Sequence, residues 1–112
     1  MKPFPALALL LMLPACQPAG EKTVEAVLDA RLEGGTVTLQ CRRSSSGSCH
    51  ALFYTDRELL GAVAKAGESA SAEGIGPGTR YCVDAEQPDP AKCRPRPLEE
   101  GEQIVRRNKT GG

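Results

Sequence analysis

The sequence predicts a small, mainly β domain in which antiparallel strands form a sandwich-like or barrel-like fold with two disulfides. The chain has 112 residues, which suits a single domain. Twelve glycines and nine prolines indicate many turns, whereas the 40% of apolar residues argues against a disordered chain. Apolar and polar residues alternate on both sides of Gly34-Gly35, a pattern typical of a β-hairpin.

The charges of the chain are balanced. Its 14 Lys and Arg residues match its 14 Asp and Glu residues, so the formal net charge is zero. A nucleic-acid-binding domain usually carries an excess of basic residues gathered on one face. We therefore expect no nucleic-acid partner.

The amino-terminal residues have the pattern of an export signal. The apolar run Phe4–Leu13 is too short to cross a bilayer core of about 30 Å, but it has the length of a signal-peptide core. The run ends at Leu13-Pro14-Ala15-Cys16, which resembles the lipobox of bacterial lipoprotein precursors. The resemblance implies that residues 1–15 are removed and that Cys16 is acylated as the new amino terminus. An ordinary secretory signal, which would leave Cys16 as a free thiol, is the alternative.

The same resemblance implies a location and a division of the chain. Gln17 rather than Asp follows the cysteine, which by the sorting rule for such lipoproteins favours the outer membrane, with the domain facing the periplasm. The lipid on Cys16 would then be the membrane attachment. We expect residues 16–22 to be the lipidated cysteine and a tether, residues 23–107 the folded domain, and residues 108–112 a flexible tail.

The four other cysteines are expected to form disulfides, because an even set in an exported chain is normally oxidised. Three connectivities are possible, and we favour two local pairs because each pair brackets a polar loop: Cys41–Cys49 and Cys82–Cys93. Closing a loop of about ten residues contributes roughly 2–3 kcal/mol to stability. A four-thiolate zinc site is disfavoured, because zinc ligands usually follow a C-x₂₋₄-C spacing. We expect no metal and no cofactor.

Residues 23–41 predict the hairpin. Folding the chain at Gly34-Gly35 places Leu32 opposite Val37 and keeps apolar residues opposite one another. Glycine supplies the positive φ that a two-residue hairpin turn needs. A helix over 23–33 is the competing interpretation, but it leaves the alternation after the glycines unexplained.

The rest of the domain also predicts strands. The apolar run in 50–55 is typical of a strand buried on both faces. Residues 56–66 fit either one short helix that follows a capping-box pattern or a strand that returns over 69–75. We favour the strand slightly, because the sequence that follows is of the β type. Residues 103–107 predict a final edge strand.

The segment Gly74–Val83 combines a glycine-rich turn with a strand that begins near a tyrosine. It resembles the turn and strand that precede the late core strand of fibronectin type III-like sandwiches, in which the tyrosine lies at a corner. The resemblance covers only this segment, so it supports a sandwich-like domain and no family. The glycines do not indicate a phosphate-binding loop, because Pro77 interrupts the spacing and a strand follows.

Residues suited to catalysis are few. His50 is the single histidine, and serines precede it, but neither G-x-S-x-G nor S-x-x-K is present. We therefore expect no enzyme and name no catalytic residue.

The loop between Cys41 and Cys49 is the candidate partner-binding element, through Arg42 and Arg43. A closed loop loses less conformational entropy on binding, and the planar guanidinium group pairs with carboxylate or phosphate in a fixed geometry. We expect a binding, accessory or structural module whose partner is another envelope protein. The alternative is a lipoprotein inhibitor of an envelope-targeting hydrolase such as lysozyme, presenting the same loop.

Overall fold

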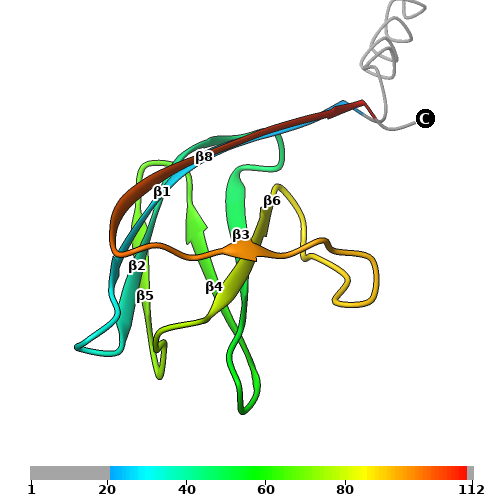
Figure 1. Cartoon of the computed structure of the whole chain (residues 1–112). Helices are drawn as coiled ribbons and strands as arrows, with labels where there is room; N and C mark the ends of the chain where they lie inside the picture. The colour runs from blue at the N-terminus through cyan, green and yellow to red at the C-terminus, as the bar shows by residue number, and fades with distance from the viewer. Residues whose placement is uncertain (1–20, 111–112) are drawn as a thin grey trace, which may run out of the picture.

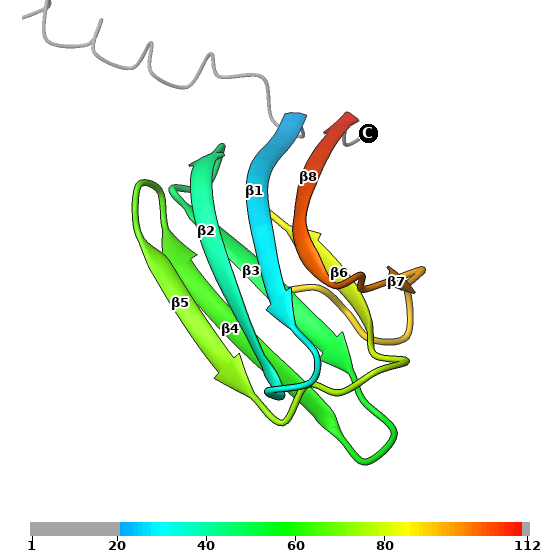
Figure 2. The ribbon, with the colours of Figure 1, turned by 60° about the vertical axis from the view of Figure 1, so that its left-hand side comes forward.

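The computed structural model describes residues 21–110, which form two four-stranded antiparallel sheets with a shared core (Figures 1 and 2). The strand orders are β5-β2-β1-β8 and β4-β3-β6-β7. The strands are β1 (Glu21–Arg31), β2 (Thr36–Ser44), β3 (Ser48–Tyr54), β4 (Leu59–Lys65), β5 (Ser69–Glu73), β6 (Arg80–Asp84), β7 (Arg96–Pro97) and β8 (Gly101–Thr110). The mainly β, antiparallel fold is confirmed.

The stretch 56–66 forms a hairpin turn and a strand, and the described residues contain no helix. Thr55 makes the side-chain contacts of a helix cap, but its backbone N–H donates to the Glu58 carbonyl at 3.1 Å, which closes a hairpin turn. The Thr55 hydroxyl accepts hydrogen bonds from the N–H groups of Arg57 and Glu58, and it donates one to the Glu58 carbonyl. The threonine therefore closes the turn between β3 and β4. Residues 21–110 also contain no helix that could span a membrane.

The predicted hairpin is confirmed, but its predicted register is wrong by two residues. Ala30 rather than Leu32 lies opposite Val37, because residues 32–35 all belong to the turn. Leu32 stays in the turn because its N–H donates to the Glu100 carboxylate (2.9 Å) and its side chain packs at the rim of the core. A shift of two residues preserves the faces of both strands, so apolar residues still meet.

The core lies between the sheets and is aliphatic apart from two aromatic rings. Its largest fully buried side chains come from both sheets and the turn before β6: Phe53, Leu28, Leu39, Ile75, Val37 and Val83. In β3 the consecutive residues Ala51, Leu52 and Phe53 are all buried, as predicted for a strand covered on both faces.

Both local disulfides are confirmed. Cys82 of β6 is joined to Cys93, with 6.5 Å between their Cα atoms, and this bond fastens the 85–95 segment to the second sheet. Cys41 of β2 is joined to Cys49 of β3, with 5.5 Å between Cα atoms. Because β2 and β3 belong to different sheets, the second of these short-range bonds also links the two halves of the core.

The first and last strands pair along their length, from Glu21 opposite Thr110 to Ala30 opposite Gly101. Strand β1 thus begins inside the expected tether, and β8 continues into the expected flexible tail. Pairing explains both differences, because each segment supplies the backbone partner of the other. The signal-like segment and Cys16 lie outside the described residues.

Candidate functional site

A β-bulge brings the two candidate arginines to one side of the first sheet. The register of β1 and β2 shifts between Glu25 and Ala26, so that Ala26 lies opposite Cys41 and Glu25 opposite Arg43. Arg42 is the extra residue. In a regular strand, neighbouring side chains point to opposite faces, whereas a bulge lets two successive side chains share one face. Arg42 and Arg43 therefore both reach Glu25.

Three arginines surround the Glu25 carboxylate, and we call these four residues the Glu25 cluster. Arg43 Nε lies 3.2 Å from Glu25 Oε1, while Arg42 Nη1 and Arg106 Nε lie 3.9 and 3.7 Å from Oε2. The Glu25 side chain is only 14% exposed, whereas the side chains of Arg42, Arg43 and Arg106 are 55%, 76% and 72% exposed. One largely buried negative charge thus holds three exposed positive charges.

The cluster borders a hollow of about 370 Å³. Strands β1, β2 and β8 supply its walls, which include Thr23, Glu25, Arg43, Arg106 and Arg107. Polar and guanidinium groups therefore surround a space that can accept carboxylate or phosphate oxygens.

Sequence reasoning missed Arg106 as part of this site. Arg106 lies opposite Glu25 in the β1–β8 pairing, which joins the two ends of the domain. Local alternation predicts a strand there, but it does not identify the partner of that strand. The signal that was present, an acidic residue in the first strand and basic residues in the last, is common to many sequences.

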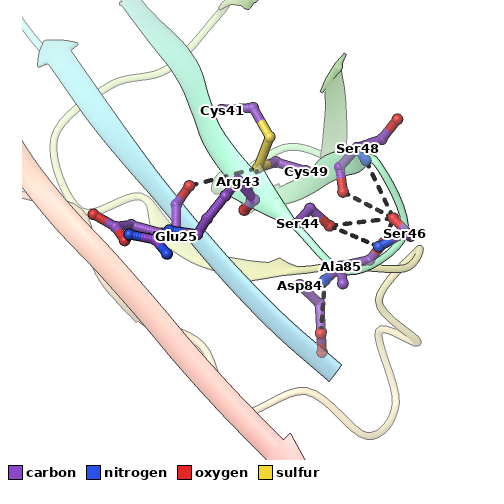
Figure 3. Close-up of a disulfide and its surroundings, with 9 residues drawn as sticks. All are labelled: Glu25, Cys41, Arg43, Ser44, Ser46, Ser48, Cys49, Asp84 and Ala85. Atoms are coloured by element: carbon purple, nitrogen blue, oxygen red, sulfur yellow. Dashed lines mark hydrogen bonds and ion pairs between the residues drawn. A yellow bond between two sulfur atoms is a disulfide. The ribbon is translucent and has the colours of Figure 1, made fainter. Parts of the chain in front are cut away.

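The turn after the arginines is fastened to the rest of the domain by serine side chains. Arg42 and Arg43 belong to β2, and the turn that connects β2 to β3 consists of Ser45, Ser46 and Gly47. Figure 3 shows the Ser46 side chain hydrogen-bonded to Ser44 and Ser48. The Ser46 hydroxyl lies within hydrogen-bonding distance of the Ser48 and Ala85 carbonyls and can donate its single proton to either one, and the Ser45 hydroxyl accepts from the Thr23 N–H at 3.1 Å. The serines therefore fasten the turn to β1 and to the segment after β6.

His50 lies in β3, apart from these hydrogen bonds. Its Nδ1 atom is buried and has no hydrogen-bond partner in the structure. The part of the chain that the structure describes contains no group of three His, Cys, Asp or Glu side chains arranged to hold a metal ion.

Tyr81 lies in β6 and links the second sheet to β8 of the first sheet. Its hydroxyl accepts a hydrogen bond from Gln103 Nε2 at 3.3 Å. Burial raises the pKa of Tyr81 above its usual value of 10.0; the nearby Arg96 lowers the pKa and Glu99 raises it, both by smaller amounts. The phenol therefore stays neutral beyond the usual range of tyrosine.

Comparison with known proteins gives no relative from which a role could be transferred. The chain matches no protein-family model, no curated protein and no solved structure.

Proposed function

We propose that this chain is a bacterial outer-membrane lipoprotein whose disulfide-bonded β domain binds another envelope protein on the periplasmic side. The lipobox-like sequence supports attachment through a lipid on Cys16. The Glu25 cluster supports binding, and it is the observation on which the proposal depends. The partner surface that fits it carries at least two carboxylates.

The chemistry of the cluster favours binding over a purely structural role. The three guanidinium groups are exposed and screened by water, and pairs of this kind contribute about 1 kcal/mol or less each, so the fold needs no more than one of them to pair with Glu25. The same arrangement orients the guanidinium groups before a partner arrives, which lowers the entropic cost of association. One carboxylate against three guanidinium groups leaves positive charge for a partner to neutralise.

The test is affinity capture from a bacterial envelope extract, with the wild type compared with the double variant Arg42→Ala, Arg43→Ala. We expect the double variant to bind the captured partner at least tenfold more weakly, a loss of about 1.4 kcal/mol. Its melting temperature should stay close to that of the wild type, because both side chains are exposed and Arg106 still pairs with the Glu25 carboxylate.

A matched control removes two exposed arginines elsewhere, Arg31 at the end of β1 and Arg57 in the β3–β4 turn. This control variant should capture the partner as the wild type does. Equal capture by the Arg42, Arg43 variant and the wild type would show that the cluster is not the binding surface.

Inhibition of a hydrolase such as lysozyme is the second candidate function. The exposed tip of the serine turn favours it, because Ser45 and Ser46 are held on both sides by hydrogen bonds and lie beside the Cys41–Cys49 disulfide. A rigid exposed turn can enter an enzyme cleft without a large loss of entropy. The purified chain should then slow the lysis of cell walls by lysozyme, and an unchanged rate would remove this candidate.

A further inference from the structure

A second groove lies where the two sheets come apart, between β6, the segment before β7, and β8. Its volume is about 800 Å³. In Figure 2, β6, β7 and β8 lie along the same side of the molecule. The lining residues are Tyr81, Cys82, Val83, Arg94, Arg96 and Ile104–Arg107. Of these, only Arg106 also belongs to the Glu25 cluster.

Backbone edges of both sheets face this groove. Strand β8 pairs with β1 on one side and with no strand of residues 21–110 on the other. Strand β6 pairs with β7 only through Arg80 and Tyr81, which leaves Cys82–Asp84 unpaired on that side. An unpaired edge presents N–H and C=O groups that another extended chain can bind. Four consecutive residues of β8 and three of β6 line the groove.

The side chains around the groove are strongly basic above an apolar floor. Arg94, Arg96, Arg106 and Arg107 line it, and no carboxylate does. Among the described side chains, only Arg106 of these four forms an ion pair, the one with Glu25. The floor consists of the buried side chains of Tyr81, Val83 and Val105, and Ile104 beside them is 60% exposed.

We propose that this groove binds an acidic, extended segment of a partner protein, which adds as a strand to the free edge of β8. Carboxylates of the segment would pair with the four arginines, and its backbone would pair with Ile104–Arg107. The proposal deepens the proposed function, because it rests on the chain being a binding module and specifies the chemistry of the partner. Strand addition of this kind takes affinity from the backbone and specificity from side-chain pockets.

Two other occupants fit the groove less well. A second copy of the chain pairing through β8 would bring the Arg106 and Arg107 side chains of both copies together, and like charges facing each other across strands are destabilising. A small anion such as phosphate would engage the guanidinium groups but would leave both backbone edges unpaired.

Protection of an exposed edge against aggregation is another role for charged residues on a strand. Arg106 and Arg107 on β8 would be enough for that role. It does not account for Arg94 and Arg96, which reach the same groove from a different segment.

The experiment measures the binding of a fluorescein-labelled heptapeptide of alternating glutamate and valine to the full-length chain in detergent, by fluorescence anisotropy. Three comparisons isolate the parts of the proposal. One replaces glutamate with lysine in the peptide, another methylates alternate amide nitrogens of the peptide, and the third uses the variant Arg94→Glu, Arg96→Glu. The charge-matched control is Arg31→Glu, Arg57→Glu, which lies outside the groove.

We expect each of the three comparisons to weaken binding at least tenfold and the control variant to change it less than twofold. Hydrogen exchange of alternate amides in Ile104–Arg107 should slow at least tenfold when the glutamate peptide is bound. Two results would overturn the proposal and show that the groove is a general anion site. The methylated peptide would bind as tightly as the unmodified one, or inorganic phosphate at the peptide's own concentration would displace the glutamate peptide. The proposal would also be overturned if the glutamate peptide did not bind. It would be overturned as well if exchange in β8 slowed only as the protein concentration rose, because a second copy of the chain would then be the occupant.

Failure of this proposal and failure of the proposed function are distinguishable. The peptide assay needs neither the lipid nor the natural partner, and its variants leave Arg42 and Arg43 unchanged. Loss of envelope capture in the Arg42, Arg43 variant with no peptide binding would refute the groove alone. Peptide binding with no captured envelope protein would refute the proposed function alone.

Discussion

Tyr81 shows how one side chain connects β6, β8 and the turn between β7 and β8. Its ring belongs to the core and its hydroxyl accepts from Gln103 Nε2. The Gln103 side chain also donates to the Pro97 carbonyl at 3.3 Å and accepts from the Glu99 N–H at 3.1 Å. A single hydrogen bond of this kind contributes about 1 kcal/mol, but here it joins the edges of the two sheets.

The raised pKa of Tyr81 predicts a loss of stability at alkaline pH. The folded protein holds the phenol proton more tightly than the unfolded chain does, so the stabilising contribution is complete below about pH 10. Above that pH the unfolded state deprotonates first, and the free energy of unfolding falls until the folded-state pKa is passed. Urea unfolding from pH 8 to 11 should show a steeper decline for the wild type than for Tyr81→Phe.

The Tyr81→Phe variant serves as the baseline for the wild type, because the two proteins differ only in the phenol hydroxyl. It should be slightly less stable than the wild type at pH 8, where only the hydrogen bond to Gln103 is lost. Parallel declines for the two proteins would contradict the role given to the Tyr81 phenol.

At the scale of the elements, sequence reasoning predicted the strands correctly, but it missed the turn and the bulge that set the pairing of β1 with β2. Alternation correctly predicted β1 and β2, because one face of each strand is buried, and the continuous apolar run predicted β3, because that strand is buried on both faces. The register of β1 and β2 was missed, since it depends on the contact of Leu32 with Glu100, far along the chain. The bulge at Arg42 was missed for a related reason, because neither alternation nor charge indicates which strand carries an extra residue.

The turn between β1 and β2 gives a test at this scale. Gly35 has a φ of +74°, a conformation that costs a residue with a side chain roughly 1–2 kcal/mol. The Cβ atom added in Gly35→Ala would meet only the Ile75 carbonyl oxygen, at 3.9 Å, so the cost would come from the backbone conformation alone. We expect this variant to lower the free energy of unfolding by about 1 kcal/mol in urea titration.

Gly34→Ala is the matched control. Gly34 does not have a positive φ, and its added Cβ would make only ordinary contacts, at 3.7 and 3.9 Å, with Arg31. This variant should match the wild type or exceed its stability slightly, because alanine restricts the unfolded chain. Equal losses in the two variants would mean that turn geometry is not what requires glycine at position 35.

For the whole molecule, the pairing of the first strand with the last determines both candidate surfaces. Arg106 joins the Glu25 cluster, and β8 forms one wall of the groove, only because β8 returns to β1. The disulfides were predictable because their loops are short, whereas this pairing joins residues about 80 positions apart and leaves no periodic signal in the sequence. The candidate site was therefore half predicted, through Arg42 and Arg43.

Membrane attachment is the prediction that concerns the entire chain. Cys16→Ser should abolish both labelling by a fatty-acid probe and recovery of the protein in the membrane fraction, because in the proposed lipoprotein the acyl chains on Cys16 would supply the attachment. Ala19→Ser, which keeps the cysteine, should be labelled and recovered like the wild type. Labelling that persists in Cys16→Ser would refute the lipoprotein interpretation.

The antiparallel pairing of β1 and β8 also determines how the domain would respond to mechanical tension. Glu21 and Thr110 are neighbours at the same end of the ladder, so force applied between the two ends of the chain pulls directly across one backbone pair at a time. Under such a load, β8 would peel from β1 pair by pair, beginning at Glu21 and Thr110. If the membrane holds the amino terminus while a bound segment pulls on the edge of β8, the same ladder carries the load. The β1–β8 ladder then lies between the anchor and the partner.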